Sequence, residues 1–156
     1  MLDALGAKDG KLIFTGSGSE ANNLAILGSA HTGRHLNSRR VLITDSEHAS
    51  VENTAEVLSS RGFEIVRIPT KGGALDLDTI ASEAKKGVCL ASFMLVNNET
   101  GAIYDIESAA EIIKKACPAA LIHCDAVQGF MKIQVSMQIW HSRRHVLKLY
   151  TKICRR

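Results

Sequence analysis

Short apolar runs of strand-like composition alternate with helix-like segments along this chain, and this alternation constrains its fold more than any other feature. The strand-like runs cover residues 11–15, 41–44, 63–68, 88–96 and 120–124. The intervals between the runs are too long for hairpins and suit parallel strands joined by crossover helices. The sequence therefore predicts an α/β domain with a mainly parallel sheet flanked by helices.

Apolar residues recur at helical spacing between the strand-like runs. One series begins after Ala49, and a second follows Asp105, which is placed to cap its helix. A third helix is expected from about Glu20 to Ala30. Each series puts its apolar side chains on one face of a helix, which indicates burial against the sheet. The members are Val51, Ala55 and Leu58 in the first series, and Ile106, Ala109, Ala110, Ile113 and Cys117 in the second.

The length of 156 residues bounds the chain to one core. No apolar run approaches the roughly 20 residues needed to cross a bilayer, and the start of the chain lacks the features of a signal peptide. We therefore expect a cytoplasmic location, with no membrane or nucleic-acid partner. The four cysteines form no CxxC pair, so no metal site is expected.

The basic residues are concentrated at the end of the chain. Residues 134–156 contain six of the 19 Lys and Arg residues and no acid, whereas residues 1–133 contain 13 basic and 16 acidic side chains. The net charge of +3 therefore belongs to the tail and not to the domain. We place the only boundary near Ile133, between a domain of residues 1–133 and a basic tail of residues 134–156.

Four polar clusters each follow a strand-like run. They are Gly-Ser-Gly-Ser-Glu at 16–20, Asp-Ser-Glu-His at 45–48, Asn-Asn-Glu at 97–99 and His-Cys-Asp-Ala-Val-Gln at 123–128. The carboxyl ends of parallel strands meet at one edge of a sheet, where such folds bind their ligands. The four clusters therefore predict one shared site.

Each cluster taken alone has a functional and a structural interpretation. The glycine-rich turn suits an anion at a helix N-terminus, with a hydroxyl from Ser19, or serves only as a turn. His48 is placed to stack on a flat ring or move protons, or is a surface histidine before a helix. Asn97 and Asn98 suit a turn without any function. Asp125 needs a cationic or hydrogen-bonding partner, such as a protonated cofactor nitrogen, or caps the next helix.

Taken together, the motifs resemble those of the class V aminotransferases, with the cysteine desulfurase branch most similar. The matching segments are residues 14–23, 46–48, 96–101 and 123–128, in the family's order and spacing, and the resemblance covers about residues 8–133. It implies a partial large domain of fold type I and the cofactor pyridoxal 5′-phosphate (PLP). The chain departs from the commoner motifs with Gly-Ser-Gly-Ser for Ser-Gly-Ala-Thr and Asp-Ala-Val-Gln for Asp-Ala-Thr-Gln.

The resemblance implies a role for six residues. Gly18 and Ser19 match the pair that holds the PLP phosphate at a helix N-terminus. His48 matches the catalytic imidazole that stacks on the pyridine ring and relays protons. The other three match residues at the cofactor's polar atoms: Asn98 near the phenolic oxygen and the substrate carboxylate, Asp125 at the pyridinium nitrogen, and Gln128 as a donor to the phenolic oxygen.

A complete desulfurase of this branch releases sulfur from L-cysteine and leaves alanine and an enzyme persulfide. The resemblance also implies a homodimer, a sulfur-acceptor protein and a role in iron–sulfur cluster assembly. The reaction needs a lysine that binds PLP covalently and a mobile cysteine. The family's Ser-x-His-Lys motif is not found, and Lys148, Lys152 and Cys154 lie in no matching context. We therefore expect the chain alone to be inactive.

Two explanations remain open for the tail that follows Val135. A frameshift or premature end would replace the family pattern with unrelated sequence. A genuine basic helix would pack against the domain or bind an anionic surface. Two function classes follow from these explanations: a PLP enzyme segment without its lysine, and a non-catalytic module that binds PLP, an anion or a partner.

Overall fold

The structure, a computed structural model, describes residues 13–32, 38–130 and 132–133. Its centre is a four-stranded parallel sheet in the order β2-β1-β5-β6. This arrangement confirms the predicted α/β class. The strands are β1 (Arg40–Thr44), β2 (Glu64–Ile68), β5 (Leu90–Met94) and β6 (Leu121–Asp125).

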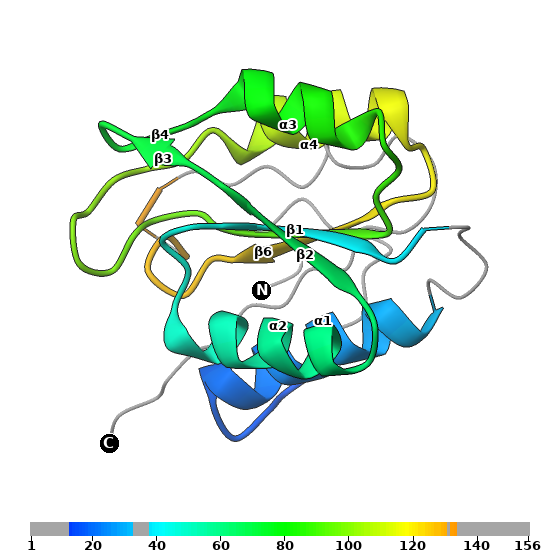
Figure 1. Cartoon of the computed structure of the whole chain (residues 1–156). Coiled ribbons are helices and arrows are strands. Elements are labelled where there is room, and N and C mark those ends of the chain that lie inside the picture. The colour runs from blue at the N-terminus through cyan, green and yellow to red at the C-terminus, as the bar shows by residue number, and fades with distance from the viewer. Residues whose placement is uncertain (1–12, 33–37, 131, 134–156) are drawn as a thin grey trace.

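Two layers of helices cover the sheet, one on each face (Figure 1). Helices α1 (Gly18–Thr32) and α2 (Ala49–Ser60) pack together below the sheet in this view. Helices α3 (Leu77–Ala84) and α4 (Ile106–Ala116) pack together above it. A short antiparallel hairpin of β3 (Thr70–Lys71) and β4 (Ala74–Leu75) precedes α3.

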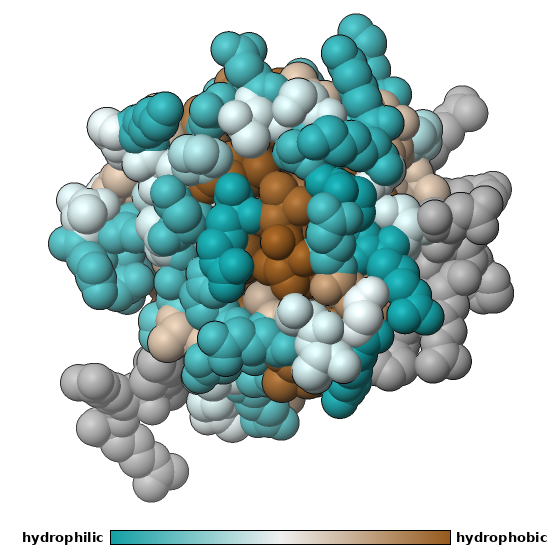
Figure 2. All heavy atoms as spheres, in the orientation of Figure 1, coloured by the Kyte–Doolittle hydropathy of each residue, from teal (hydrophilic) through white to brown (hydrophobic). Residues whose placement is uncertain are grey.

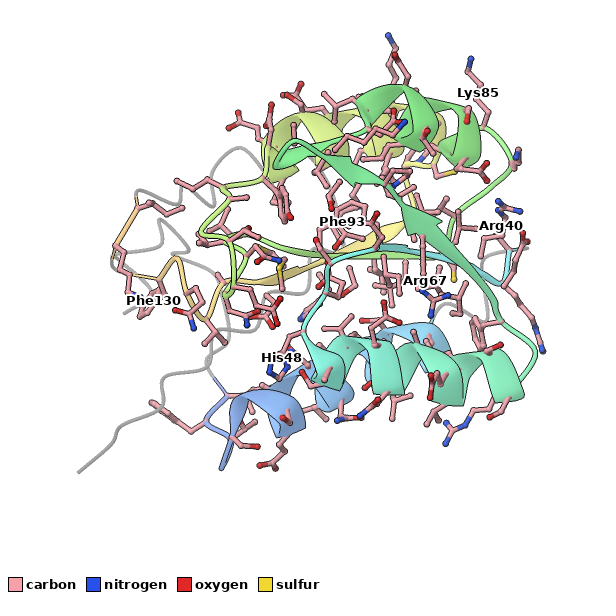
Figure 3. The ribbon with its side chains drawn as sticks, turned by 60° about the vertical axis from the view of Figure 1, so that its left-hand side comes forward. Arg40, His48, Arg67, Lys85, Phe93 and Phe130 are labelled. Carbon is pink, nitrogen blue, oxygen red and sulfur yellow. The ribbon has the colours of Figure 1, made fainter. Side chains whose placement is uncertain are left out.

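The core consists of one apolar cluster on each side of the sheet. Phe93 of β5 is fully buried among residues of the α3 and α4 layer (Figure 3), and Ile43 of β1 is buried with residues of α1 and α2. The edge strand β2 is less covered, since Ile65 and Val66 are only partly buried. Figure 2 shows an apolar strip between hydrophilic residues in the region where β2 crosses the view of Figure 1.

Both apolar series predicted for the helices face the core. All three members of the first series are buried in α2, and the first four of the second are buried in α4. Asp105 caps α4 as predicted, because its Oδ1 accepts a hydrogen bond from the Ser108 N–H at 3.0 Å. Cys117 lies at the C-cap of α4, where it is partly buried.

The prediction of a strand at residues 11–15 is wrong for residues 13–15, which form no strand, while residues 11 and 12 lie outside the described part. Ile13 is 54% exposed and Phe14 is 81% exposed, so neither residue gains the cover that a strand of a parallel sheet needs. Helix α1 begins two residues before Glu20, because the Ser17 hydroxyl accepts a hydrogen bond from the Glu20 N–H.

Strand β5 is shorter than the predicted run of residues 88–96, because its pairing with β6 extends only from Leu90 to Met94. The sequence patterns did not predict the hairpin or α3. The tail of residues 134–156 lies outside the described residues, and so do Lys148, Lys152 and Cys154, which match no family motif. Within the described part of the chain, every helix is too short or too polar to span a membrane.

The strand order creates a topological switch point between β1 and β5. From β1 the chain passes through α2 to β2 on one side, and it later returns to place β5 on the other side of β1. Connections that leave neighbouring strands in opposite directions open a crevice at the carboxyl ends of those strands, where α/β sheets bind ligands. The polar segments after Thr44 and Met94 border this crevice.

Candidate functional site

A cleft of about 880 Å³ lies at the carboxyl ends of β1 and β5. The segment after β1, the loop of residues 97–102 and the turn of the β3–β4 hairpin line the cleft. His48 and Asn98, two of the six predicted site residues, are in its walls. Figure 3 shows His48 where α2 begins, next to α1. The other four predicted residues do not line this cleft, so the cleft and the predicted site overlap only in part.

Asp125 ends β6 and is 8% exposed, as predicted for a carboxylate that follows an apolar strand. Its Oδ2 accepts a hydrogen bond from the Asn22 side-chain amide at 2.8 Å, and its Oδ1 accepts one from the Val127 N–H at 3.0 Å. Residues 127–130 form turns, so Asp125 caps a turn where the alternative interpretation expected a helix. Among the described residues, no cation pairs with this buried carboxylate.

A chain of hydrogen bonds connects Asp125 to His48. The Asn22 amide of α1 also donates to the Ser50 hydroxyl at 2.9 Å, and that hydroxyl lies 2.8 Å from Nδ1 of His48. Asn22 and Ser50 are 2% and 7% exposed, whereas His48 is exposed. The chain therefore runs from a buried carboxylate at the sheet to an accessible imidazole at the cleft.

Gly18 and Ser19 form the first turn of α1, one turn before Asn22. Ser17 caps this end of the helix by accepting a hydrogen bond from the Glu20 N–H, and the Glu20 carboxylate accepts one from the Gly16 N–H at 2.7 Å. The N–H groups of Gly18 and Ser19 make no hydrogen bond within the described part of the chain. Free N–H groups at a helix N-terminus are the geometry that binds a phosphate.

The loop that carries Asn98 is held by its neighbour Asn97, which is 6% exposed. The Asn97 Oδ1 accepts hydrogen bonds from the N–H groups of Glu99 and Thr100, at 3.0 and 2.8 Å. Its Nδ2 donates to the Ser46 carbonyl at 3.1 Å. Gly101 completes the turn with φ +74°, in the left-handed region that glycine adopts readily. The exposed Asn98 is thereby fixed beside the segment that bears His48.

Gln128 is the predicted residue that this structure connects least to the others. It is exposed, and its Oε1 accepts a hydrogen bond from Lys132 Nζ at 3.3 Å. No described hydrogen bond joins Gln128 to His48, Asn98 or Asp125. Only its position, three residues after Asp125, places it near the site.

Two further ionisable side chains lie close enough to Asp125 to sense its charge. Glu47 accepts hydrogen bonds from the Thr44 hydroxyl and the Met94 N–H, while its Oε2 is enclosed without a partner among the described residues. Burial, the larger cause, and the negative charge of Asp125 together raise the pKa of Glu47 to about 8. Burial lowers the pKa of His123 to about 4, opposed by Asp125. At neutral pH Glu47 is thus mainly protonated and His123 is neutral.

This arrangement fits the cofactor that the motifs imply. A protonated pyridine nitrogen is a cation that donates one hydrogen bond, and Asp125 is a buried carboxylate beside a neutral imidazole and a protonated acid. Gly18 and Ser19 offer N–H groups to a phosphate. Within the described part of the chain, no group of three or more His, Cys, Asp or Glu side chains is placed to hold a metal ion.

Four residues organise the site without having been predicted for it: the sequence patterns gave no role to Asn22, Glu47 and Ser50, and they assigned Asn97 only to a turn. Asn22 lies three residues after Ser19, on the same side of α1, and that helical spacing was an available signal. Asn97 precedes two residues whose N–H groups an Asn side chain can bind, which is a known turn signature. No local pattern indicates that Ser50 contacts Asn22, because 28 residues separate them.

Comparison with known proteins places these residues in a family. The family model for the class V aminotransferases matches residues 2–142. A cysteine desulfurase IscS of Buchnera aphidicola is 35% identical over 138 residues, which cover 87% of this chain and 33% of the relative. The chain therefore spans about a third of the length of the curated relatives it matches.

Solved structures agree with this match. A NifS-like protein superimposes with a TM-score of 0.81 at 30% identity, over 88% of this chain and 38% of that one. A structure described as SspA in complex with cysteine gives a TM-score of 0.78 at 29% identity, over 88% and 39%. The predicted fold, a partial PLP-dependent transferase domain of fold type I, is confirmed. The chain belongs to the class V aminotransferases, a PLP-dependent family, and is similar to cysteine desulfurases of that family.

Proposed function

We propose that this chain is the cofactor-binding portion of a cysteine desulfurase, an enzyme that releases sulfur from L-cysteine. The observation that carries the proposal is the buried Asp125 carboxylate, which has no described cation partner and is connected through Asn22 and Ser50 to His48. The curated relatives named as cysteine desulfurases and the cysteine-bound SspA structure support this substrate class.

The chain's own residues would hold the cofactor at two points, its phosphate and its ring nitrogen. Gly18 and Ser19 would bind the phosphate with the N–H groups of the first turn of α1. Asp125 would bind the ring nitrogen and keep it protonated. Bound PLP supplies an electron-accepting ring that stabilises negative charge at the α-carbon of an amino acid.

Three exposed residues would act on the cofactor and the substrate. His48 lines the cleft and would stack on the ring and exchange a proton with the substrate. Asn98 would bind the phenolic oxygen and the substrate carboxylate with its amide. Gln128 would donate to the phenolic oxygen through its NH2 group, since its hydrogen bond with Lys132 uses Oε1.

The chain alone is proposed to bind PLP without releasing sulfur. Of the described cysteines, Cys89 and Cys124 are buried, and burial raises the pKa of Cys89 to about 11, so that thiol is a poor nucleophile. Lys132 contacts Gln128 but lies outside any Ser-x-His-Lys motif. That missing motif favours a second candidate, a non-catalytic module that binds PLP or another anion reversibly.

A complete enzyme built on this segment is proposed to work in the cytoplasm as a homodimer and to pass its sulfur to an acceptor protein. The family supports the dimer and the acceptor, and the lack of a bilayer-length apolar run in the sequence supports the location.

The test measures PLP binding by the full chain through absorbance. Borohydride reduction and peptide mass analysis of the same sample come next. We expect saturable binding that Asp125→Asn weakens at least tenfold, because the isosteric amide loses the charge that pairs with the ring. Asp105→Asn is the control, since it caps α4 on the other face of the sheet and asparagine caps equally well.

The reduction step separates the two candidates. An adduct on a lysine supports a surviving enzyme segment, and its position identifies the residue, with Lys132, Lys148 and Lys152 as the candidates. Saturable binding without an adduct supports the non-catalytic module. A chain that binds PLP equally well with Asp125→Asn, or does not bind it at all, contradicts the proposal.

A further inference from the structure

The hydrogen bonds around His48 determine which ring nitrogen is free. His48 is the N-cap residue of α2, with φ −63° and ψ 146°, and its Nδ1 accepts a hydrogen bond from the Ser50 N–H at 3.1 Å. A backbone N–H can only donate. Nδ1 is therefore an acceptor, and in the neutral ring the proton resides on Nε2.

A second contact at Nδ1 comes from the Ser50 hydroxyl, whose proton Asn22 leaves free to donate. The Asn22 amide has two N–H bonds, and its nitrogen lies 2.8 Å from Asp125 Oδ2 and 2.9 Å from Ser50 Oγ. The Asp125 carboxylate requires a donor, so the NH2 group and not the carbonyl oxygen of Asn22 faces both partners. Ser50 Oγ thus accepts from Asn22 and has its own proton left to donate to Nδ1, 2.8 Å away.

We propose that Asn22 and Ser50 are positioning residues that hold the His48 imidazole in its Nε2-protonated tautomer, so that this ring exchanges protons at the cleft through Nε2 alone. In the opposite tautomer, the Nδ1 proton would point at the Ser50 N–H and at the Ser50 hydroxyl, the two donors described above. Burial protects the arrangement, since Asn22, Ser50 and Asp125 are each less than 9% exposed. The role of Nε2 in catalysis rests on the proposed function, whereas the tautomer does not.

The test is the tautomer of His48 in the full chain without PLP. Long-range proton–nitrogen correlation spectra of a 15N-histidine sample distinguish protonated from unprotonated ring nitrogens, and His48→Gln identifies the relevant signals among the six histidines. The spectra are recorded at alkaline pH so that the neutral ring is populated. We expect an unprotonated Nδ1 and a protonated Nε2. A ring with the proton on Nδ1, or an equal mixture, overturns the proposal.

Ser50→Ala tests the contribution of the hydroxyl. This variant keeps the backbone N–H donor to Nδ1 and removes only the side-chain bond. We expect the ratio of the Nε2–H to the Nδ1–H form to fall about three- to tenfold, the effect of one hydrogen bond. Ser59→Ala, an exposed position of the same helix, is the matched control and should leave the ratio unchanged. An unchanged ratio in Ser50→Ala contradicts the role of Ser50.

PLP titration of the same samples separates this inference from the proposed function. The expected tautomer in a chain that does not bind PLP supports the positioning role and contradicts the proposed function. A chain that binds PLP but carries the His48 proton on Nδ1 supports the proposed function and contradicts the positioning role.

Discussion

The carboxyl group of Glu47 accepts a hydrogen bond from the backbone N–H of Met94 at 2.9 Å, which joins the segment after β1 to the last residue of β5. The bond crosses the switch point directly beside the cleft. Its acceptor is an acid whose pKa is raised to about 8 by burial and by the nearby charge of Asp125. The contact between the two strand ends is thus made by a carboxyl group that is mainly protonated at neutral pH.

Glu47 should make the chain less stable as the pH rises. The pKa of Glu47 is about 8 in the folded chain against an ordinary value of 4.5, so between these values the folded state holds a proton that the unfolded state has released. The free energy of unfolding therefore falls with rising pH, by up to about 1.4 kcal/mol per pH unit. Glu47→Gln removes this dependence, and urea unfolding from pH 6.5 to 8 measures it.

His123 has the opposite effect on the free energy of unfolding at lower pH, and for this reason the experiment begins at pH 6.5. Its pKa is about 4 in the folded chain against an ordinary value of 6.5, so between these values the unfolded state binds the extra proton and stability rises with pH. The His123 contribution fades above pH 6.5, and it cancels when wild type is compared with Glu47→Gln, because both contain His123. Equal slopes for wild type and Glu47→Gln between pH 6.5 and 8 would show that Glu47 is not buried as the structure places it.

Asn97 should determine the order of the loop beside the cleft. Asn97→Ala removes the acceptor of the Glu99 and Thr100 N–H groups and the donor to the Ser46 carbonyl, at an expected cost of about 1–3 kcal/mol. Amide hydrogen exchange at Glu99 and Thr100 should accelerate. Asn53→Ala, at an exposed position of α2, is the control with little expected effect.

Asn97→Asp separates the acceptor role of Asn97 in the loop from its donor role toward Ser46. It keeps the acceptor for the loop, loses the donor to Ser46 and sets a carboxylate oxygen against the Ser46 carbonyl. Exchange at Glu99 and Thr100 should then remain slow relative to Asn97→Ala even though overall stability falls. Fast exchange in both variants would show that the Asn97 side-chain oxygen is not what holds the loop in place.

A methyl group at Gly129 should be poorly tolerated. A Cβ there would lie 2.8 Å from Leu95 Cδ2 and 3.2 Å from Val96 Cγ2, and Leu95 is itself buried. We expect Gly129→Ala to destabilise the chain by about 1–3 kcal/mol, a typical cost of overpacking. Thermal and urea unfolding measure the change.

Gly28→Ala is the matched control for that substitution. A Cβ at Gly28 meets nothing within 4 Å, and the residue is exposed inside α1. Alanine there should stabilise the chain by about 0.5–1 kcal/mol, because glycine is the poorer helix former. If both variants change the free energy of unfolding in the same direction, the close approach of Gly129 to Leu95 does not explain the effect of Gly129→Ala.

In a complete enzyme that contains this segment, we expect Asp125→Ala to abolish turnover of the amino acid substrate. The variant removes the negative charge that would keep the cofactor ring protonated. Steady-state sulfide release measures the loss. Near-normal turnover would contradict the role assigned to Asp125.

The sequence was sufficient to predict the parts of the fold that depend on local pattern. The α2 and α4 faces follow from helical spacing of apolar residues, and the strand runs at β1, β2, β5 and β6 follow from composition and spacing. The strand expected at residues 11–15 failed because Ile13 and Phe14 have the composition of a strand but remain exposed. A strand is stabilised by pairing with adjacent strands of a sheet, and local composition does not indicate which segments will lie beside it.

The same limit applies to the site. The clusters that hold Asp125, His48 and Asn98 were predicted to share a site because each lies at a strand end, and the family resemblance then singled out these three residues. The contacts between them were not predictable. Asn22 joins Asp125 across 103 residues and Ser50 across 28, so only the packing of α1 against α2 and β6 reveals the connection.

The pairing of β1 with β5 has a consequence for how the cleft forms. Val41 pairs with Leu90, and closing a loop of nearly 50 residues costs about 3 kcal/mol of chain entropy before any contact in the cleft is made. The cleft therefore does not exist until that long-range pairing is complete. A ligand that binds only there shifts the balance between the folded and unfolded chain as a whole, and the melting temperature should rise with its concentration.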